Sequence, residues 1–447
     1  MTAYVLERAW VDGEVRDEVY VEIDAGRFTA VELRGGSRRF EGVATPTNVR
    51  DTRSSGYPDR IPGLTIPGLA NCHSHAFHRA LRGRTQQERG TFWTWRERMY
   101  AVAERLDPDS YLALATATYR EMVAAGITSV GEFHYLHHQP DGTPYDDPNV
   151  MGRALQEAAD VAGMRIRLLD TAYLSSGFGE PPEGVQRRFS DGTADAWAER
   201  FAAMTDAGAA IHSVRAVPDD ELRTIVEASE GRPLHVHLSE QEKENDACVA
   251  AYGATPTQLL ADHGVLGPLT SAVHATHLTD DDIHHLGSTR TYACFCPTTE
   301  RDLGDGIGPS RQLREKGSPL TLGSDSHAVI DLFEEMRAVE LDERLATRRR
   351  GHWTAAELLD AATTNGHASL AYDDAGSIAV GRRADLVTLD TTTPRTAGTG
   401  RDEHTAVFAA TAADVVRVMT DGKVVFEKGD EETIGRDLDD AIGRLWP

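Results

Sequence analysis

The sequence predicts an α/β protein: a distorted (β/α)8, TIM-like barrel with a small β-sandwich domain built from both ends of the chain. Three observations predict this fold. Eight short apolar runs alternate with helical segments between residues 62 and 372, as in parallel-strand barrels. The flanking parts, 1–61 and 373–447, carry alternating apolar and polar residues around tight turns. Ionisable residues gather where the central apolar runs end.

The N-terminal part reads as short strands followed by a linker. Residues 1 to about 45 alternate apolar and polar side chains, as in EVYVEIDAGRFTAVEL, with DG and AG turn signals between the runs. Residues 45–60, TPTNVRDTRSSGYPDR, are polar and contain Pro, Gly and Ser. That composition is typical of a loop, so we expect a linker there before the barrel begins.

The barrel is predicted from runs of the length and composition of buried strands. Helical segments lie between them; one example, 107–126, has Asp and Ser near its start and Gly at its end. The candidate strands, in chain order, are LTIPGLANCH, GITSVGEFHY, RIRLLDTAY, AIHSVRAV, PLHVHLSE, SAVHATH, TYACFCPT and PLTLGSDSH.

The C-terminal part returns to strands. GSIAVGRRADLVTLD begins at residue 376, and VVRVMTDGKVVFEKG contains a DG hairpin signal. A terminal helix follows. These strands are expected to join those of residues 1–61 in one small β-domain.

Charge and composition exclude several classes of partner. The chain has 46 basic and 71 acidic residues, a net charge of −25, which argues against nucleic acid and anionic membranes because both need a basic surface. No apolar stretch is long enough to cross a bilayer, and the start lacks the pattern of a signal peptide. The four cysteines form no CxxC pair. We therefore expect a cytoplasmic protein with reduced thiols that binds a small molecule.

Histidines and acids at the strand ends predict a metal site. His73 and His75 lie two residues apart on a strand, so both side chains point to the same face. One of His235 and His237, together with Asp325 after the last strand, would complete a set of three nitrogens and one oxygen. This set suits one divalent ion, zinc above all, with iron and manganese as alternatives.

These motifs resemble the amidohydrolase superfamily and, within it, the deaminase branch. PGLANCHSHAF resembles its first-strand motif, and GSIAVGRRADLVTLD its C-terminal signature; HVHLSE, VHATHL and LGSDSH lie between them in the expected order. The resemblance implies that His237 is the third histidine ligand, that Glu240 is the acid of a His-x-x-Glu pattern and that His274 is an active-site histidine. No lysine precedes Lys243, so a bridging carboxylated lysine cannot form, and one metal ion is expected.

Further segments resemble the formimidoylglutamate deiminases of histidine degradation. They are HSHAFHRAL, FWTWRERMY, EFHYLHH, QRRF, HSVRAV, EQEKE and TTERDLGDGI. The resemblance implies hydrolysis of N-formimino-L-glutamate to N-formyl-L-glutamate and ammonia. Attack by a metal-activated hydroxide on the formimino carbon is the expected chemistry, with Asp325 accepting the water proton, Glu240 as general acid and His274 orienting the oxygen. The resemblance also suggests a homodimer.

The implied substrate carries two carboxylates, and an acidic chain must bind them through local donors. The resemblance places substrate-binding side chains at Arg96, Tyr135 and Arg215, with His212 as a weaker candidate. His78 stands where the family carries Gln. A histidine can still donate a hydrogen bond at that position, but it introduces a titratable group.

Two alternative functions share the same metal site. An aminohydrolase of a heteroaromatic base, such as guanine or cytosine, would need a stacking pocket in place of paired arginines. A non-catalytic metal-binding protein would be expected to have lost a metal ligand or Glu240. This chain retains all of these residues. Of the remaining histidines, His277 and His327 are candidate neighbours of site residues. We expect exposed or loop positions for His137, His138, His284 and His285.

Overall fold

The computed structural model describes residues 1–33, 58–86 and 92–446. Most of the predicted linker at 45–60 therefore lies outside the described residues; only its last three residues are included. Among the helices of these three segments, none combines the length and the apolar character that a bilayer crossing requires.

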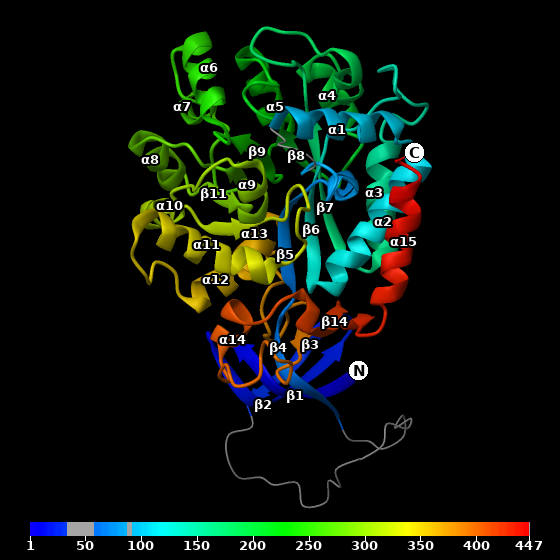
Figure 1. The fold of residues 1–447 in the computed structure, drawn as a ribbon, viewed down its shortest axis with the longest axis vertical. Helices are drawn as coiled ribbons and strands as arrows, with labels where there is room; N and C mark the ends of the chain where they lie inside the picture. Colours follow the sequence, from blue (N-terminus) through cyan, green and yellow to red (C-terminus); the bar gives the residue numbers. More distant parts are fainter. Residues whose placement is uncertain (34–57, 87–91, 447) are drawn as a thin grey trace, which may run out of the picture.

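Eight parallel strands form the nearly closed barrel that the sequence predicts (Figure 1). The order β5 to β12 around the barrel follows the chain. The gap between the last strand and the first is bridged at Ser74 and Asp325, and the amide of Asp325 donates to the carbonyl oxygen of His73 at 3.0 Å. The strands are β5 Leu69–Ser74, β6 Ile127–His134, β7 Arg165–Ala172, β8 Gly208–Ile211, β9 Leu234–Leu238, β10 Thr270–His274, β11 Tyr292–Phe295 and β12 Leu320–Leu322.

Helices surround the barrel. The predicted helix at 107–126 is α2, which the Asp107 side chain caps by accepting from the amide of Ser110. The helices are α1 Phe92–Arg105, α2 Pro108–Ala124, α3 Val150–Ala162, α4 Ala194–Phe201, α5 Leu222–Ala228, α6 Glu242–Tyr252, α7 Pro256–Asp262, α8 Asp280–Ser288, α9 Pro297–Leu303, α10 Ser310–Lys316, α11 Leu332–Thr347, α12 Ala355–Ala362, α13 Thr364–Ser369, α14 Glu403–Phe408 and α15 Glu431–Gly443, with short 3-10 helices η1 Ala76–Leu81, η2 Gly184–Phe189, η3 Asp219–Glu221 and η4 Ala412–Asp414.

The main hydrophobic core lies between the strands and these helices. Tyr111, Leu114 and Met122 of α2 are buried in the same cluster as Leu69 and Ile127 of the strands. Burying each such side chain stabilises the fold by roughly 1.5–3 kcal/mol.

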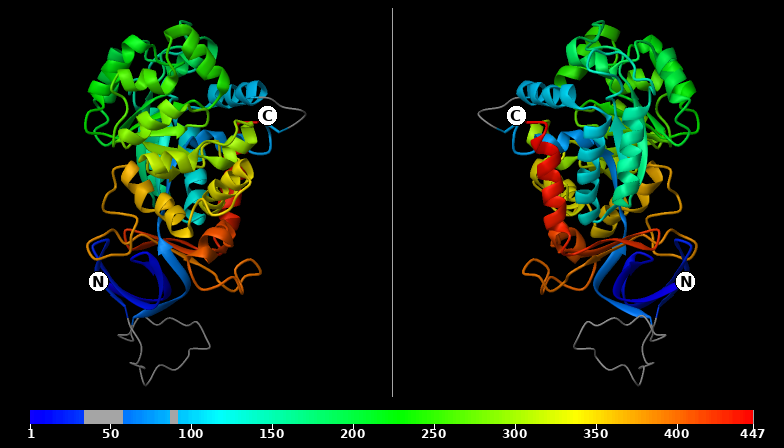
Figure 2. Two further views of the ribbon diagram at one scale, coloured as in Figure 1. Left: turned by 90° about the vertical axis from the view of Figure 1, so that its left-hand side faces the viewer. Right: turned by 90° about the vertical axis from the view of Figure 1, so that its right-hand side faces the viewer.

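Both ends of the chain form a second sheet below the barrel (Figures 1 and 2). Its strand order is β15-β14-β13-β4-β1-β2-β3, so β4 joins the N-terminal strands to the C-terminal ones. Tight turns at Asp12–Gly13 and Asp421–Gly422 have positive φ at both central residues, as the DG signals predict. The strands are β1 Thr2–Val11, β2 Glu14–Asp24, β3 Arg27–Leu33, β4 Asp59–Pro67, β13 Leu386–Leu389, β14 Val415–Thr420 and β15 Lys423–Glu427.

Several predicted barrel strands are longer than the observed ones, and the first and the fourth differ in ways that affect the site. LTIPGLANCH is not one strand: it divides at Gly68 into the end of β4, in the small sheet, and β5, in the barrel. A Cβ at Gly68 would lie 2.3 Å from Oγ1 of Thr128, so only glycine fits where the chain passes between the sheets. The run AIHSVRAV is also shorter than predicted, because β8 ends at Ile211. His212 and Arg215 therefore lie in the loop that follows it.

Candidate active site

Four side chains from three parts of the barrel meet at the carboxyl ends of its strands. His73 and His75 come from β5, His237 from β9, and Asp325 follows β12. One donor atom of each lies within 4.8 Å of the others, and all four residues are buried. The Nε2 atoms of His73 and His237 are 3.0 Å apart. Oδ1 of Asp325 lies 3.3 Å from Nε2 of both His73 and His75. His235, the other residue that the sequence left open, is not in this group.

Backbone carbonyl groups orient two of these imidazoles. Nδ1 of His75 donates to the carbonyl oxygen of Phe133 at 2.9 Å, and Nδ1 of His237 donates to that of His212 at 2.9 Å. Because a carbonyl can only accept, the Nδ1 atoms carry the hydrogens and the Nε2 lone pairs face the cluster. Burial lowers the pKa of His75 to about 3 and that of His237 well below its ordinary value. Both are therefore neutral, the form that binds metals.

Asp325 is ionised and fixed in an unusual backbone conformation. Its φ is +42°, a left-handed value that a non-glycine residue rarely adopts. Burial opposes its ionisation, but the hydrogen bond with His73 and the nearby imidazoles hold the pKa of this carboxyl well below its usual range. Three neutral imidazole nitrogens and one carboxylate oxygen form a donor set that fits a divalent metal ion, zinc in particular.

A second group of ionisable side chains lies beside this cluster. Nε2 of His274 is 3.7 Å from Oδ2 of Asp325 and 4.0 Å from Oε1 of Glu240. On the other side of the ring, Nδ1 of His274 donates to Oε1 of Glu300 at 3.4 Å. Burial alone would lower the pKa of His274, but Glu240, Glu300 and Asp325 raise it well above its ordinary value. Burial is also the main cause that raises the pKa of Glu240.

Glu300 is a residue of the site that the sequence did not indicate. It lies in the segment TTERDLGDGI, but no spacing or pattern there separates it from its neighbours. The structure shows that it is buried and that its Oε1 also accepts from the amide of Cys296 at 2.8 Å. It therefore links the end of β11 to His274.

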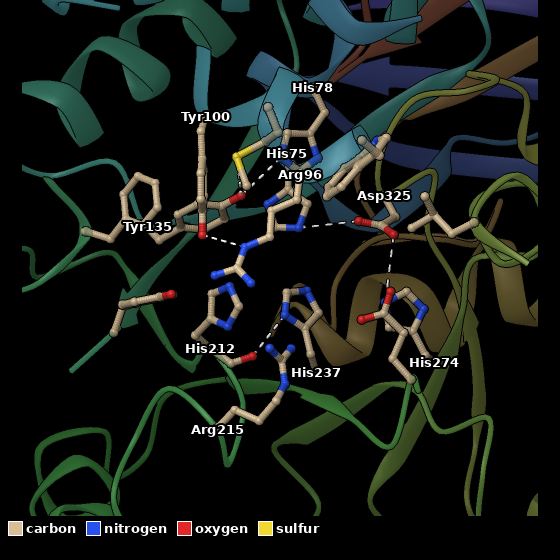
Figure 3. A pocket seen from close by; sticks show the side chains of 16 residues that line it. His75, His78, Arg96, Tyr100, Tyr135, His212, Arg215, His237, His274 and Asp325 are labelled. Carbon is tan, nitrogen blue, oxygen red and sulfur yellow. Dashed lines mark hydrogen bonds and ion pairs between the residues drawn. The ribbon is translucent and has the colours of Figure 1, made fainter. Parts of the chain in front are cut away.

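A cavity beside the cluster contains the guanidinium groups of Arg96 and Arg215 (Figure 3). Arg96 lies on α1, and its Nε donates to the hydroxyl of Tyr100 at 2.6 Å. Arg215 follows β8, and its Nε donates to Oε2 of Glu244 at 2.8 Å. The cavity is lined by His75, His78, Trp95, Arg96, Met99, Tyr100, Tyr135, Tyr173, Phe189, His212, Arg215, His237, Glu240, His274, Leu303 and Asp325.

The other predicted substrate-binding residues line the same cavity. The hydroxyl of Tyr135 lies 3.0 Å from Nε2 of His78, and both residues are buried. The His78 ring packs between those of His75 and Trp95. The His212 ring contacts Tyr135 edge to face, with ring centres 5.3 Å apart. The structure thus brings every predicted site residue to one place; Tyr100 and Glu244 are partners that the sequence did not indicate.

Six histidines that do not line the cavity also have defined places. His137 and His138 lie in the loop that follows β6, as expected, but they are buried there rather than exposed. Nε2 of His137 donates to the carbonyl oxygen of Thr171, and His138 pairs with Asp191; these partners compensate for burial. His277 contacts the carbonyl oxygen of Asp305, and His327 contacts Ser74 and Ser324. His284 is exposed and His285 is partly exposed, as expected.

Known proteins are similar to this chain in sequence. A family model described as the amidohydrolase family matches residues 64–425. A formimidoylglutamate deiminase from Pseudomonas aeruginosa is 36% identical over 422 residues, which cover 89% of this chain and 93% of that protein. A 5-methylthioadenosine/S-adenosylhomocysteine deaminase from Pelotomaculum thermopropionicum is 28% identical over 95% of this chain and 92% of that one.

The fold is also similar to that of a solved structure. A crystal structure of an amidohydrolase from Brucella melitensis superimposes with a TM-score of 0.85 and 30% sequence identity, covering all of both chains. The same barrel and small sheet therefore occur in a protein of related sequence.

Proposed function

The chain belongs to the amidohydrolase family, and from that membership we propose that it hydrolyses N-formimino-L-glutamate to N-formyl-L-glutamate and ammonia. One observation carries the proposal: the cavity lined by His75, His237 and Asp325 of the donor cluster also holds the guanidinium groups of Arg96 and Arg215. A substrate with an amidine at one end and two carboxylates fits that combination. The 36% identity to the Pseudomonas formimidoylglutamate deiminase supports the same choice.

His73, His75, His237 and Asp325 would hold a divalent metal ion, for which zinc is the best match to the donors. When bound, such an ion lowers the pKa of a coordinated water toward ~7 and so supplies a nucleophile at neutral pH. Neutral imidazoles and an ionised carboxylate are the forms that ligation requires, and burial and hydrogen bonding favour those forms.

Three side chains would move or hold protons during hydrolysis. Asp325 accepts a proton from the attacking water, whose oxygen bonds to the formimino carbon. The raised pKa of Glu240 keeps this residue able to carry a proton. Glu240 delivers that proton to the terminal nitrogen of the formimino group as the carbon–nitrogen bond breaks. His274 donates from Nε2 to the oxygen that develops negative charge. Overall, the oxygen of water ends in the formyl group and both of its hydrogens end on ammonia.

Arg96, Arg215 and Tyr135 would bind the two carboxylates, with His212 and His78 in support. Arginine binds a carboxylate through two parallel hydrogen bonds. Glu244 raises the pKa of Arg215 despite burial, so that guanidinium stays charged. These local donors are needed because the chain as a whole carries a net charge of −25 and repels an anion at long range.

A second candidate is an aminohydrolase of a heteroaromatic base. Trp95, Tyr100, Tyr173 and Phe189 line the cavity and could stack on a planar ring. Two guanidinium groups in the same space argue against a neutral ring, because such a ring offers no carboxylate for their N–H donors.

The direct test is ammonia release by protein of known metal content. We expect turnover of N-formimino-L-glutamate, about one metal ion per chain, and loss of turnover after chelation that added zinc restores. Guanine and cytosine serve as comparison substrates. Turnover of either base in preference to the formimino compound would refute the proposed substrate and leave the metal assignment standing.

A further inference from the structure

The C-terminal end of the chain contacts two elements that line the cavity. Helix α15 runs along the outside of the barrel beside α2, and the chain end lies next to α1 at the far end from the small sheet (Figures 1 and 2). Leu445 and Trp446 follow this helix. They contact η1, which carries His78, the turn after η1, and α1, which carries Arg96.

Trp446 is hydrogen-bonded to η1. Its indole Nε1 donates to the carbonyl oxygen of Ala80 at 2.9 Å. Ala80 is buried and lies two residues after His78 in the same short helix. The contact joins residues 366 positions apart in the sequence, so it depends on the complete fold.

The same C-terminal residues also contact α1. The guanidinium carbon of Arg98, on α1, lies 6.0 Å from the centre of the Trp446 ring. That of Arg84, in the turn after η1, lies 5.3 Å from it. Arg105, the last residue of α1, donates to the carbonyl oxygen of Leu445, which is itself buried. Arginine over an indole ring is a favourable cation–π arrangement.

Helix α1 depends on such contacts for its position. A helix of 14 residues is only marginally stable by itself in water. Met99 and Val102 are buried, whereas Glu97 and Arg98 are exposed. Packing therefore holds α1 along one side, and the C-terminal contacts hold it at Arg98 and Arg105.

We propose that Trp446 is a positioning residue for substrate binding: it fixes η1 and α1 together and so sets where His78 and Arg96 face the cavity. Trp446 does not line the cavity itself. The link to substrate rests on the proposed function, because it takes Arg96 and His78 as substrate-binding residues. Fixing η1 and α1 in place does not depend on which substrate is bound.

The test uses two substitutions of Trp446 and matched ones of Trp353. Trp353 has the same kinds of contact: its Nε1 donates to Oγ of Ser310 at 3.1 Å, and the guanidinium carbon of Arg311 lies 5.3 Å from its ring centre. Trp353 lies two residues before α12, a helix that Figure 1 shows well away from α15. W446A, W446F, W353A and W353F are compared by steady-state kinetics, metal content and amide hydrogen exchange of the full-length protein.

We expect W446A to raise KM for N-formimino-L-glutamate about five- to twentyfold while kcat changes less than about twofold, because a binding group is misplaced and the metal site is intact. Amides of α1 should exchange faster, with metal content unchanged. W446F keeps the ring over the arginines and loses the bond to Ala80, so its KM should be intermediate. The Trp353 variants should lose thermal stability and keep the wild-type KM.

Unchanged exchange in α1 of W446A would overturn the proposal, as would equal KM increases in the Trp353 variants. Faster exchange with an unchanged KM would overturn the link to substrate binding. If the wild-type protein does not hydrolyse N-formimino-L-glutamate, the proposed function fails, and amide exchange alone then decides whether Trp446 fixes α1.

Discussion

Arg215 donates a hydrogen bond from Nε to Oε2 of the buried Glu244 at 2.8 Å. This contact uses one edge of the guanidinium and directs its terminal nitrogens toward the cavity (Figure 3). A carboxylate of the substrate can then be bound without further loss of side-chain freedom. Glu244 does not line the cavity, but through this pair it positions a residue that does.

The first prediction concerns this pair. E244Q should raise KM for N-formimino-L-glutamate about tenfold and change kcat little, because a charge-assisted hydrogen bond that orients Arg215 becomes weaker. Steady-state kinetics checks it. E315Q is the control, since Glu315 pairs with the surface residue Arg311 and should leave KM unchanged. A wild-type KM in E244Q would show that Arg215 is positioned without Glu244.

The second prediction separates the two histidines of β9. H237N should lose bound metal and activity, because His237 is in the donor cluster. H235N should keep about one metal ion per chain, since His235 is outside that cluster. Metal analysis of both purified variants checks this. Metal retained by H237N and lost from H235N would reverse the assignment.

The third prediction concerns proton transfer. E240Q should keep its metal and lose about 10²- to 10⁴-fold in kcat, the usual contribution of a general acid. E242Q is its neighbour in sequence and a matched control, because the side chain of Glu242 is 83% exposed. A kcat of E240Q close to that of E242Q would show that another group protonates the leaving nitrogen.

The fourth prediction concerns acid stability. Burial opposes ionisation of Asp170 and Asp191, but Arg200, with His138 beside Asp191, holds both pKa values below the ordinary one. Such carboxylates stabilise the fold above their unfolded pKa of about 3.9, and this stabilisation is lost as the pH falls below about 4. The unfolding temperature should therefore fall steeply below about pH 4.

The control for the acid prediction is D170N, which removes one of the two depressed groups. Its unfolding temperature should be lower than that of the wild type at pH 7 and should depend less on pH below about 4. Identical pH dependence of the two proteins would mean that other carboxylates control acid unfolding.

Much of the fold was predictable because strand and helix periodicities are local properties of the sequence. The eight strands, the DG hairpins and the cap of α2 all follow from neighbouring residues. The division of LTIPGLANCH between two sheets does not, since two consecutive buried strands read as one apolar run. Contact with Thr128 decides it, and that residue lies 60 positions from Gly68.

The candidate site was predictable to the extent that motifs carried it. HSH, HVHLSE and LGSDSH indicated residues that the structure brings together. Glu244, Glu300 and Trp446 were not indicated, because their relevance depends on partners that are distant in the sequence. The burial of His137 and His138 was not predicted for the same reason: their partners, Thr171 and Asp191, belong to other segments.

The central claim is that this cavity hydrolyses an amidine while binding two carboxylates. Its most direct test compares kcat/KM for N-formimino-L-glutamate with that for N-formimino-4-aminobutyrate, which has the same amidine but lacks the α-carboxylate. We expect the second value to be about 30- to 1,000-fold lower, because this compound lacks one of the two carboxylates that the guanidinium groups would bind. Equal values would contradict the roles given to Arg96 and Arg215.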